Sequence, residues 1–305
     1  MDNKETRYFC IGEHYVKVNF TDTTHNNMNL MRSYYPFLVE SVEDDKLLFE
    51  ITIDDTLKPI AKSQRERIRE FETGNGSVIV DELEGGGYQF IFKDKLPIEC
   101  CMFQVDSTYK HVKCALTGNY DMRTYGIHNA MMLSYAIAGS LQDTILIHAS
   151  VVRQNGYGYA FHAASGTGKS TQVSMWLRYI PGCDLMNDDN PVIRIIDDQP
   201  YIYGSPWSGK TPCYRNIKAK LGGLTRIDRD DRNWVETLSP IQGFTSVLPS
   251  CSAMKWDVPT YRRIGDTVSK IVGNKKVKVS ILHCLPNREA AEVCNEAIAV
   301  KEKDA

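Results

Sequence analysis

Residues 161–171, Phe-His-Ala-Ala-Ser-Gly-Thr-Gly-Lys-Ser-Thr, constrain the fold of this chain more than any other stretch. Two β-like runs precede them, over residues 144–153 and 157–161, and the Asn-Gly pair within 154–156 is typical of a tight hairpin turn. Apolar residues then recur at helical spacing over residues 173–180. The sequence therefore predicts a strand, a glycine-rich loop and a helix of about three turns in direct succession.

This succession is typical of a phosphate-binding loop. Gly166 and Gly168 can adopt backbone angles that turn successive N–H groups toward phosphate oxygens, and the N-terminus of the helix adds partial positive charge. Lys169 can reach the β- and γ-phosphates of ATP, and the Ser170 hydroxyl can ligate Mg²⁺. A glycine-rich turn without a ligand is the alternative. The residues predicted to hold the nucleotide are Ala163, Ala164, Ser165, Gly166, Thr167, Gly168, Lys169, Ser170 and Thr171.

Two adjacent aspartates follow the next predicted strand, residues 183–186. Asp188 comes nineteen residues after Lys169, a spacing at which the chain can return to the phosphates and present Asp188 and Asp189 as metal ligand and catalytic base. Which aspartate has which role is left open. The alternative is a solvated turn before Pro191.

A second loop, residues 204–211, follows a predicted hairpin formed by residues 192–196 and 201–203. Its glycines, hydroxyls and Lys210 suit an anionic ligand, so Lys210 and Arg215 are candidates for contact with the transferred phosphoryl group. An exposed turn is an equally good interpretation.

The loop and the aspartates together resemble the nucleotide-binding core of HPr kinase/phosphorylase and of ATP-dependent phosphoenolpyruvate carboxykinase. The resemblance covers roughly residues 144–215 and includes the Leu-Ile-His-Ala-Ser-Val-Val run at 146–152. It implies a mixed-sheet P-loop kinase core, ATP and Mg²⁺ as cofactors, and a base acting on a serine hydroxyl. It also implies that His148 lies near the phosphates, with a structural histidine as the alternative. Related enzymes form oligomers, although no repeat in this sequence supports that independently.

The sequence thus favours a Mg²⁺-dependent kinase that transfers the γ-phosphoryl group of ATP to a hydroxyl of a protein, peptide or small molecule. Two alternatives stay open: a nucleotide-binding regulatory or scaffold protein without transfer activity, and a carboxykinase-like lyase. The acceptor and the preferred nucleotide base are not determined by the sequence.

The remainder of the chain predicts the domain organisation. Residues 1–118 alternate apolar and polar positions and are expected to form an antiparallel β module, in which 61–73 is either an exposed helix or an edge strand. Residues 119–143 predict a buried connecting helix, and 144–305 the kinase domain. Within that domain, residues 221–235 suggest one strand, and the alternating charges around Arg229 favour an exposed surface. His162, at the end of the strand before the loop, is expected to have a packing role. A fold class of α+β or α/β follows.

Charge and cysteine content exclude several classes of protein. The net charge of -2 gives no basic surface for nucleic acid, and no apolar run approaches the roughly 18 residues that a membrane-spanning helix requires. The nine cysteines are scattered without a metal-binding spacing, which favours reduced thiols and a cytoplasmic location.

Overall fold

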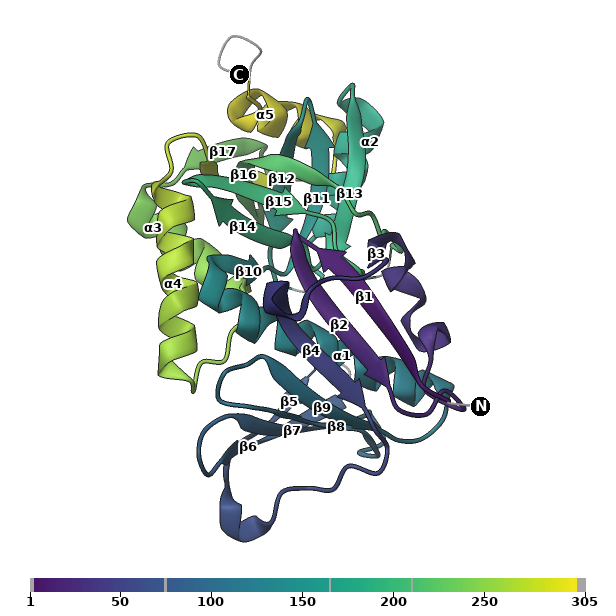
Figure 1. The fold of residues 1–305 in the computed structure, drawn as a ribbon. Helices are drawn as coiled ribbons and strands as arrows, with labels where there is room; N and C mark the ends of the chain where they lie inside the picture. Colours follow the sequence, from purple (N-terminus) through teal and green to yellow (C-terminus); the bar gives the residue numbers. More distant parts are fainter. Residues whose placement is uncertain (1–2, 74–75, 165, 210, 301–305) are drawn as a thin grey trace. The chain divides into compact units, whose positions relative to one another are not determined.

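The computed structural model describes residues 3–73, 76–164, 166–209 and 211–300 (Figure 1). The N-terminal residues with the alternating pattern form one extended sheet. The chain divides into two compact units, Met1–Ala138 and Gly139–Ala305. Among the described residues, the sheet of the first unit has nine strands in the order β3-β1-β2-β4-β9-β8-β7-β6-β5. In chain order they are β1 (Glu5–Ile11), β2 (His14–Phe20), β3 (Leu38–Val39), β4 (Leu47–Ile53), β5 (Arg65–Thr73), β6 (Gly76–Leu83), β7 (Tyr88–Lys93), β8 (Glu99–Val105) and β9 (His111–Leu116).

This sheet is mixed, which corrects the expectation of an antiparallel module. β2 pairs parallel with β4, and β4 pairs parallel with β9, whereas the other pairs are antiparallel. Parallel neighbours need a crossover connection, and both are present. The 3-10 helix η1 (Met28–Phe37) and β3 lie between β2 and β4 in the chain, and the meander β5–β8 lies between β4 and β9.

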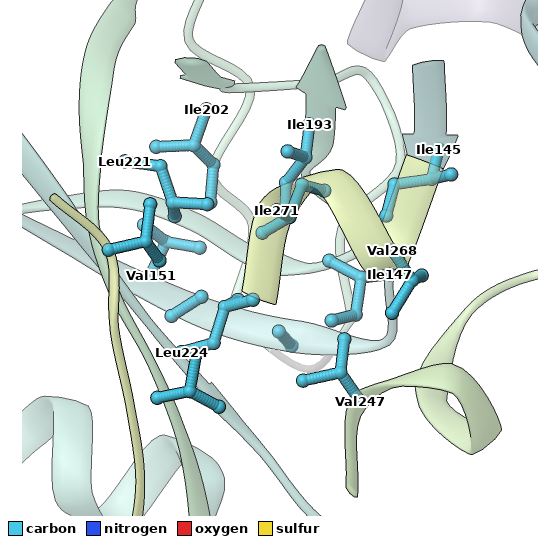
Figure 2. Close-up of a cluster of buried hydrophobic side chains, with 14 of the residues drawn as sticks. Ile145, Ile147, Val151, Ile193, Ile202, Leu221, Leu224, Val247, Val268 and Ile271 are labelled. Atoms are coloured by element: carbon cyan, nitrogen blue, oxygen red, sulfur yellow. The ribbon is translucent and has the colours of Figure 1, made fainter. Parts of the chain in front are cut away.

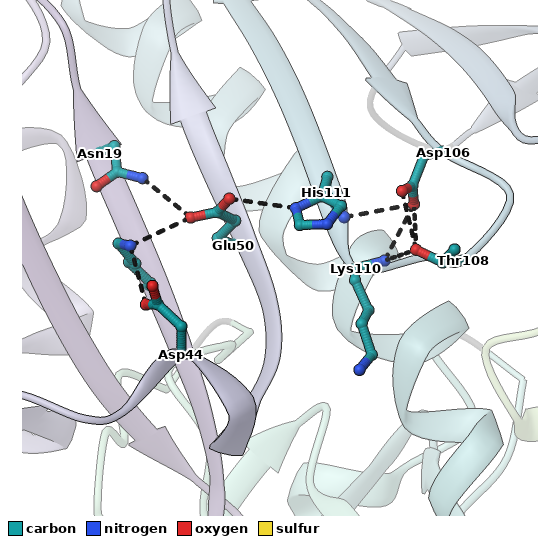
Figure 3. A network of polar contacts seen from close by, with 8 residues as sticks. Asn19, Asp44, Glu50, Asp106, Thr108, Lys110 and His111 are labelled. Atoms are coloured by element: carbon teal, nitrogen blue, oxygen red, sulfur yellow. Dashed lines mark hydrogen bonds and ion pairs between the residues drawn. The ribbon is translucent and has the colours of Figure 1, made fainter.

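A polar network on one face links the parallel strands (Figure 3). The Glu50 carboxylate of β4 accepts from Lys17 Nζ of β2 at 3.3 Å and lies 3.2 Å from His111 Nδ1 of β9. Lys17 also contacts Asp44 at 3.1 Å. Lys17 and Glu50 are directly opposite each other in the β2–β4 pair, and Glu50 and His111 are directly opposite in the β4–β9 pair. Each such exposed pair stabilises by only about 0–1 kcal/mol, so the network supports the register rather than the stability of the sheet.

The ambiguous stretch 61–73 forms the 3-10 helix η3 (Lys62–Gln64) and the edge strand β5.

Helix α1 (Tyr120–Gly139) follows β9. Its C-terminal half is buried, and Tyr135 Oη donates to the carbonyl of Ile11 at 2.8 Å. In the described part of the chain, no helix is both long and apolar enough to cross a membrane.

The second unit contains another mixed sheet, ordered β10-β14-β15-β16-β12-β11-β13, with β18 paired to β16 and β17 to β18. Its elements are β10 (Thr144–Leu146), β11 (Ala149–Gln154), β12 (Tyr157–His162), α2 (Lys169–Tyr179), β13 (Cys183–Asp189), β14 (Val192–Ile196), β15 (Gln199–Tyr203), β16 (Lys218–Arg229), β17 (Trp234–Thr237), α3 (Pro240–Val247), α4 (Val258–Gly273), β18 (Lys278–Cys284) and α5 (Arg288–Ile298). β12, β16 and β18 run parallel to one another.

Helices cover both faces of this sheet because successive strand residues point to opposite sides. Val151 packs in the cluster that contains α3 and α4, whereas Val152 packs in the cluster that contains α2 and α5. Figure 2 shows the first cluster, where Leu224 of β16 lies with Val247 of α3 and Val268 of α4. The result is a three-layer arrangement in which α2 is fixed against β12, the strand that precedes the glycine-rich loop.

Two runs expected as single strands are each divided in two. Residues 144–153 form β10 and β11, which pair with different neighbours, and His148 lies between them. Residues 221–235 form the end of β16 and the start of β17. Both expected hairpin turns are confirmed by positive φ angles, 52° at Asn155 and 79° at Gly156 in the first and 49° and 61° in the turn before β15.

Candidate functional site

The glycine-rich loop connects β12 directly to α2, as the sequence predicts. Gly166 and Gly168 have φ angles of 78° and 126°, and a Cβ atom at either position would meet nothing within 4 Å. Glycine is therefore required here for its backbone conformation and not for space. Ala163, Ala164, Gly166, Thr167 and Gly168 lie in the loop, Lys169, Ser170 and Thr171 lie in the first turn of α2, and Ser165 lies outside the described residues.

Lys169 is the buried cation of the site. Its side chain is 9% exposed, and its Nζ donates to the carbonyl of Ala163 at 3.1 Å, so the side chain folds back across the loop. Burial lowers the pKa of Lys169, while the negative charges of Asp189 and Asp188 act in the opposite direction. The charged ammonium thus depends on nearby anions, which phosphate oxygens would supplement.

Asp188 lies beside the start of α2. Its Oδ1 accepts from Ser170 Oγ at 3.4 Å and from the hydroxyl of Ser150, and its Oδ2 accepts from the N–H of Thr211 at 3.3 Å. Ser150 of β11 is its register partner and is 1% exposed. Three donors from three segments therefore fix the orientation of a carboxylate that is only 4% exposed.

Asp189 is more accessible and has an unusual backbone. Its φ of 123° lies in a region that residues with a Cβ rarely adopt, and such strain is concentrated at functional sites. Asp189 Oδ1 lies 3.2 Å from His148 Nδ1, and the two side chains are 32% and 43% exposed. Burial lowers the pKa of His148, Asp189 opposes this, and Lys169 adds to it. A neutral His148 beside an accessible carboxylate follows.

The loop after β15 contacts the backbone carbonyl of Asp188. The carbonyl of Asp188 accepts from Gly209 N–H at 2.7 Å and from Ser208 Oγ at 3.0 Å. Lys210 lies outside the described residues. Arg215 contacts Asp184 Oδ2 at 2.9 Å and the carbonyl of Leu185, near the other end of β13. The structure therefore does not bring the Arg215 guanidinium to Asp188 and Asp189.

Two contacts of the site were not anticipated from the sequence. The sequence placed Ser150 in the β-like run before the loop without a role in the site. Its contact with Asp188 depends on the β11–β13 register. Arg229 was assigned to a surface stretch of mixed charge, yet its Nη2 donates to the carbonyl of Gly166 at 2.6 Å and its Nε to that of Thr167 at 3.3 Å. Arg229 holds two loop carbonyls away from the inside of the loop. Arg229 reaches the loop because β16 pairs parallel with β12, so this contact could be found only once that pairing was known.

His162 ends β12 in a buried position. It is 1% exposed, and its Nδ1 lies 3.0 Å from Ser250 Oγ. The carbonyl of Ser250 accepts from the N–H of His148 at 2.7 Å, so one residue connects the end of the loop strand to the segment that carries His148. Burial first, and then the charges of Arg226 and Lys169, lower the pKa of His162 to about 4. The packing role expected for His162 agrees with these contacts.

We expect His162 to make stability depend on pH. Its pKa is 6.5 when unperturbed and about 4 in the fold, so below about pH 6.5 the unfolded chain binds a proton that the folded chain does not. Stability should fall as pH decreases through this window. Between pH 7 and pH 4.5, the free energy of unfolding of the parent should fall by about 2 kcal/mol more than that of a His162→Gln variant. Urea unfolding at both pH values measures this, and parallel pH curves would contradict it.

Comparisons with known proteins give a distant structural likeness. No protein-family model matches the chain, and no curated protein matches it. Among solved structures, it is similar to the Hpr(Ser) kinase/phosphatase from Coxiella burnetii, at 10% sequence identity and a TM-score of 0.30, with 50% of this chain and 86% of that chain covered. At this TM-score the likeness carries no weight.

Proposed function

We propose that the protein is an ATP- and Mg²⁺-dependent phosphotransferase that moves the γ-phosphoryl group to a hydroxyl, most simply that of a serine in a protein or peptide or of a small molecule. The observation that carries the proposal is the approach of Asp188 to the first turn of α2, with 3.4 Å between its Oδ1 and Ser170 Oγ. A glycine-rich loop, a buried lysine and paired carboxylates at one helix N-terminus suit phosphoryl transfer, which depends mainly on positioning and charge stabilisation.

The loop and Lys169 would hold the phosphates. The backbone N–H groups at the start of α2 have no partner within the helix and point toward its N-terminus, where an anion is favoured. Lys169 already lies over the loop, and Arg229 withdraws the carbonyls of Gly166 and Thr167. The site therefore offers donors to phosphate oxygens and directs acceptors elsewhere.

The oxygens of Ser170 and Asp188 fit a magnesium ion. Among the described residues, no three His, Cys, Asp or Glu side chains are grouped to hold a metal by themselves. Mg²⁺ in such sites is bound by one or two carboxylates together with phosphate oxygens and water, so a hydroxyl and one carboxylate are sufficient. When bound, the ion would neutralise charge on the phosphates. Ser150 and the Thr211 N–H orient Asp188 for this contact.

Asp189 is the better candidate for the base. It is about one-third exposed, whereas Asp188 is almost fully enclosed, so an acceptor hydroxyl can approach Asp189. The hydroxyl proton would pass to a carboxylate oxygen of Asp189 as the acceptor oxygen bonds to the γ-phosphorus and the bond to the β-phosphate oxygen breaks. The His148 ring, with Nδ1 at 3.2 Å from Asp189 Oδ1, borders this carboxylate on one side.

Turnover of ATP with hydroxyl acceptors tests the proposal. We expect ADP formation that requires Mg²⁺ and increases when serine-containing peptides or free serine are added, with the phosphate recovered on the acceptor hydroxyl. A Ser174→Ala variant is a suitable control because the exposed Ser174 hydroxyl donates to the Ser170 carbonyl, at 2.8 Å, and the variant should retain the parent rate. Nucleotide binding without ADP formation under any of these conditions would contradict transfer and favour a nucleotide-binding regulatory protein.

A further inference from the structure

A pocket of about 470 Å³ lies against one flank of the glycine-rich loop. Gly166, Thr167 and Gly168 form one wall of it, and the first turns of α2 contribute Thr171 and Gln172. The opposite wall comes from the C-terminal ends of β16 and β18 and from the residues just beyond them. A volume of this size is within the range of pockets that bind small molecules.

The strand order places this pocket and the two aspartates on opposite flanks of the loop. β12, which leads into the loop, lies between β16 on one side and β11 on the other, and β13 with its aspartates follows β11 (Figure 1). β12, β16 and β18 are parallel, so their C-terminal ends meet at the same edge of the sheet, where ligands of α/β proteins bind. A nucleotide whose phosphates cross the loop with the γ-phosphoryl at the aspartates would extend its other end toward this pocket.

The chemistry of the pocket suits a flat heterocycle. Ile227, Leu285 and Pro286 give it apolar walls, and Leu285 is 40% exposed. Gln172 contributes a polar group that is 2% exposed, and its Nε2 has no hydrogen-bond partner among the described residues. An enclosed amide N–H without a partner is costly, and a ligand acceptor in the pocket would satisfy it.

We propose that this pocket binds the adenine base of the nucleotide and that Gln172 reads the base. The proposal rests on the nucleotide-binding function proposed above. A carboxamide has one donor and one acceptor group, which match the N7 acceptor and the N6 amino donor of adenine. Guanine presents two acceptors, N7 and O6, at the same edge and would need two donors. The charged donor of the pocket, Arg229, is already bonded to the loop carbonyls.

Calorimetric titration with Mg·ATP, Mg·GTP and magnesium tripolyphosphate tests this assignment. We expect the parent to prefer ATP over GTP. Gln172→Leu should weaken ATP binding about tenfold, remove the preference over GTP and leave tripolyphosphate affinity unchanged. Leu285→Ala should weaken ATP and GTP alike, by several-fold, and also spare tripolyphosphate. Leu177→Ala is a matched control, because Leu177 on α2 is 39% exposed and does not line the pocket.

The outcomes separate the pocket from the phosphate loop. Equal ATP and GTP affinity in the parent, or equal losses of ATP and tripolyphosphate affinity in the variants, would overturn the pocket assignment. If Gln172→Leu does not fold, Leu285→Ala decides, because truncation of a partly exposed side chain leaves the core intact. ATP binding without tripolyphosphate binding would support the pocket and remove the proposed phosphate loop. No binding of any of the three would overturn both.

Discussion

Lys169→Ala should abolish the stabilisation that Mg·ATP gives to the parent protein. A ligand that binds only the folded state at a hundredfold excess over its dissociation constant adds about 2.7 kcal/mol, which corresponds to a rise of roughly 5–10 °C in melting temperature for a domain of this size. Lys169 is the enclosed cation over the loop, and its ammonium already lacks full solvation. Without it, the phosphates lose the charge partner in the least hydrated part of the site, where a charge is worth most.

The same variant without ligand should melt close to the parent. In the parent, Lys169 Nζ donates to the Ala163 carbonyl, and burial already disfavours the charge, so little stability is lost with the side chain. Lys220→Ala is the matched control, because Lys220 is an exposed lysine that pairs with Tyr157 at the far end of β12. The control should keep the full nucleotide-dependent shift. Equal shifts in the parent and Lys169→Ala would show that the loop does not hold the phosphates.

Local patterns were sufficient to predict the loop and its neighbours. The Asn155-Gly156 turn, the two glycines and the apolar spacing of α2 act over a few residues each, and strand, loop and helix form where these patterns predict them. Such features depend little on distant parts of the chain. The charged residues of 61–73 suit an exposed helix or an edge strand, and only the pairing with β6 distinguishes the edge strand β5.

Pairing between distant strands could not be predicted in this way. The run over 144–153 is mostly apolar and has no turn signal, and its division at His148 reflects two different partners, β14 for β10 and β12 with β13 for β11. The parallel pairs of the first sheet likewise depend on crossovers and not on strand composition. Ser150 meets Asp188 only because of the β11–β13 register.

The helices α3 and α4 had no sequence prediction, although local signals for both are present. Ser239 and Gln242 form a reciprocal capping box at the start of α3, and Asp257 accepts from the Thr260 N–H at the start of α4. Further along each helix, Val247 of α3 and Val268 of α4 pack in the cluster of Figure 2. A search for caps would have located both elements, whereas the face of the sheet that they cover depends on tertiary packing.

Asp188→Asn and Asp189→Asn should both reduce phosphoryl transfer by orders of magnitude, for different reasons. Asp189→Asn removes the proposed base, and loss of general base catalysis costs about 10²–10⁴-fold. It should leave the Mg·ATP-dependent rise in melting temperature intact, because Asp189 lies beside His148 and is not assigned to the magnesium ion. Asp188→Asn should lose transfer and also the dependence of nucleotide binding on Mg²⁺, because this carboxylate lies beside Ser170.

Rates of transfer and melting shifts at several Mg²⁺ concentrations, measured on the same preparations, distinguish the two roles. Asp197→Asn is the matched control, since Asp197 is an exposed turn residue with a φ of 49°, which asparagine tolerates. Normal transfer in Asp189→Asn would exclude it as the base. If Asp189→Asn instead lost the Mg²⁺ dependence and Asp188→Asn kept it, the two roles would be exchanged. The exposed Asp189, with its strained backbone, would then be the metal ligand, and the enclosed Asp188 would be the base that receives the proton.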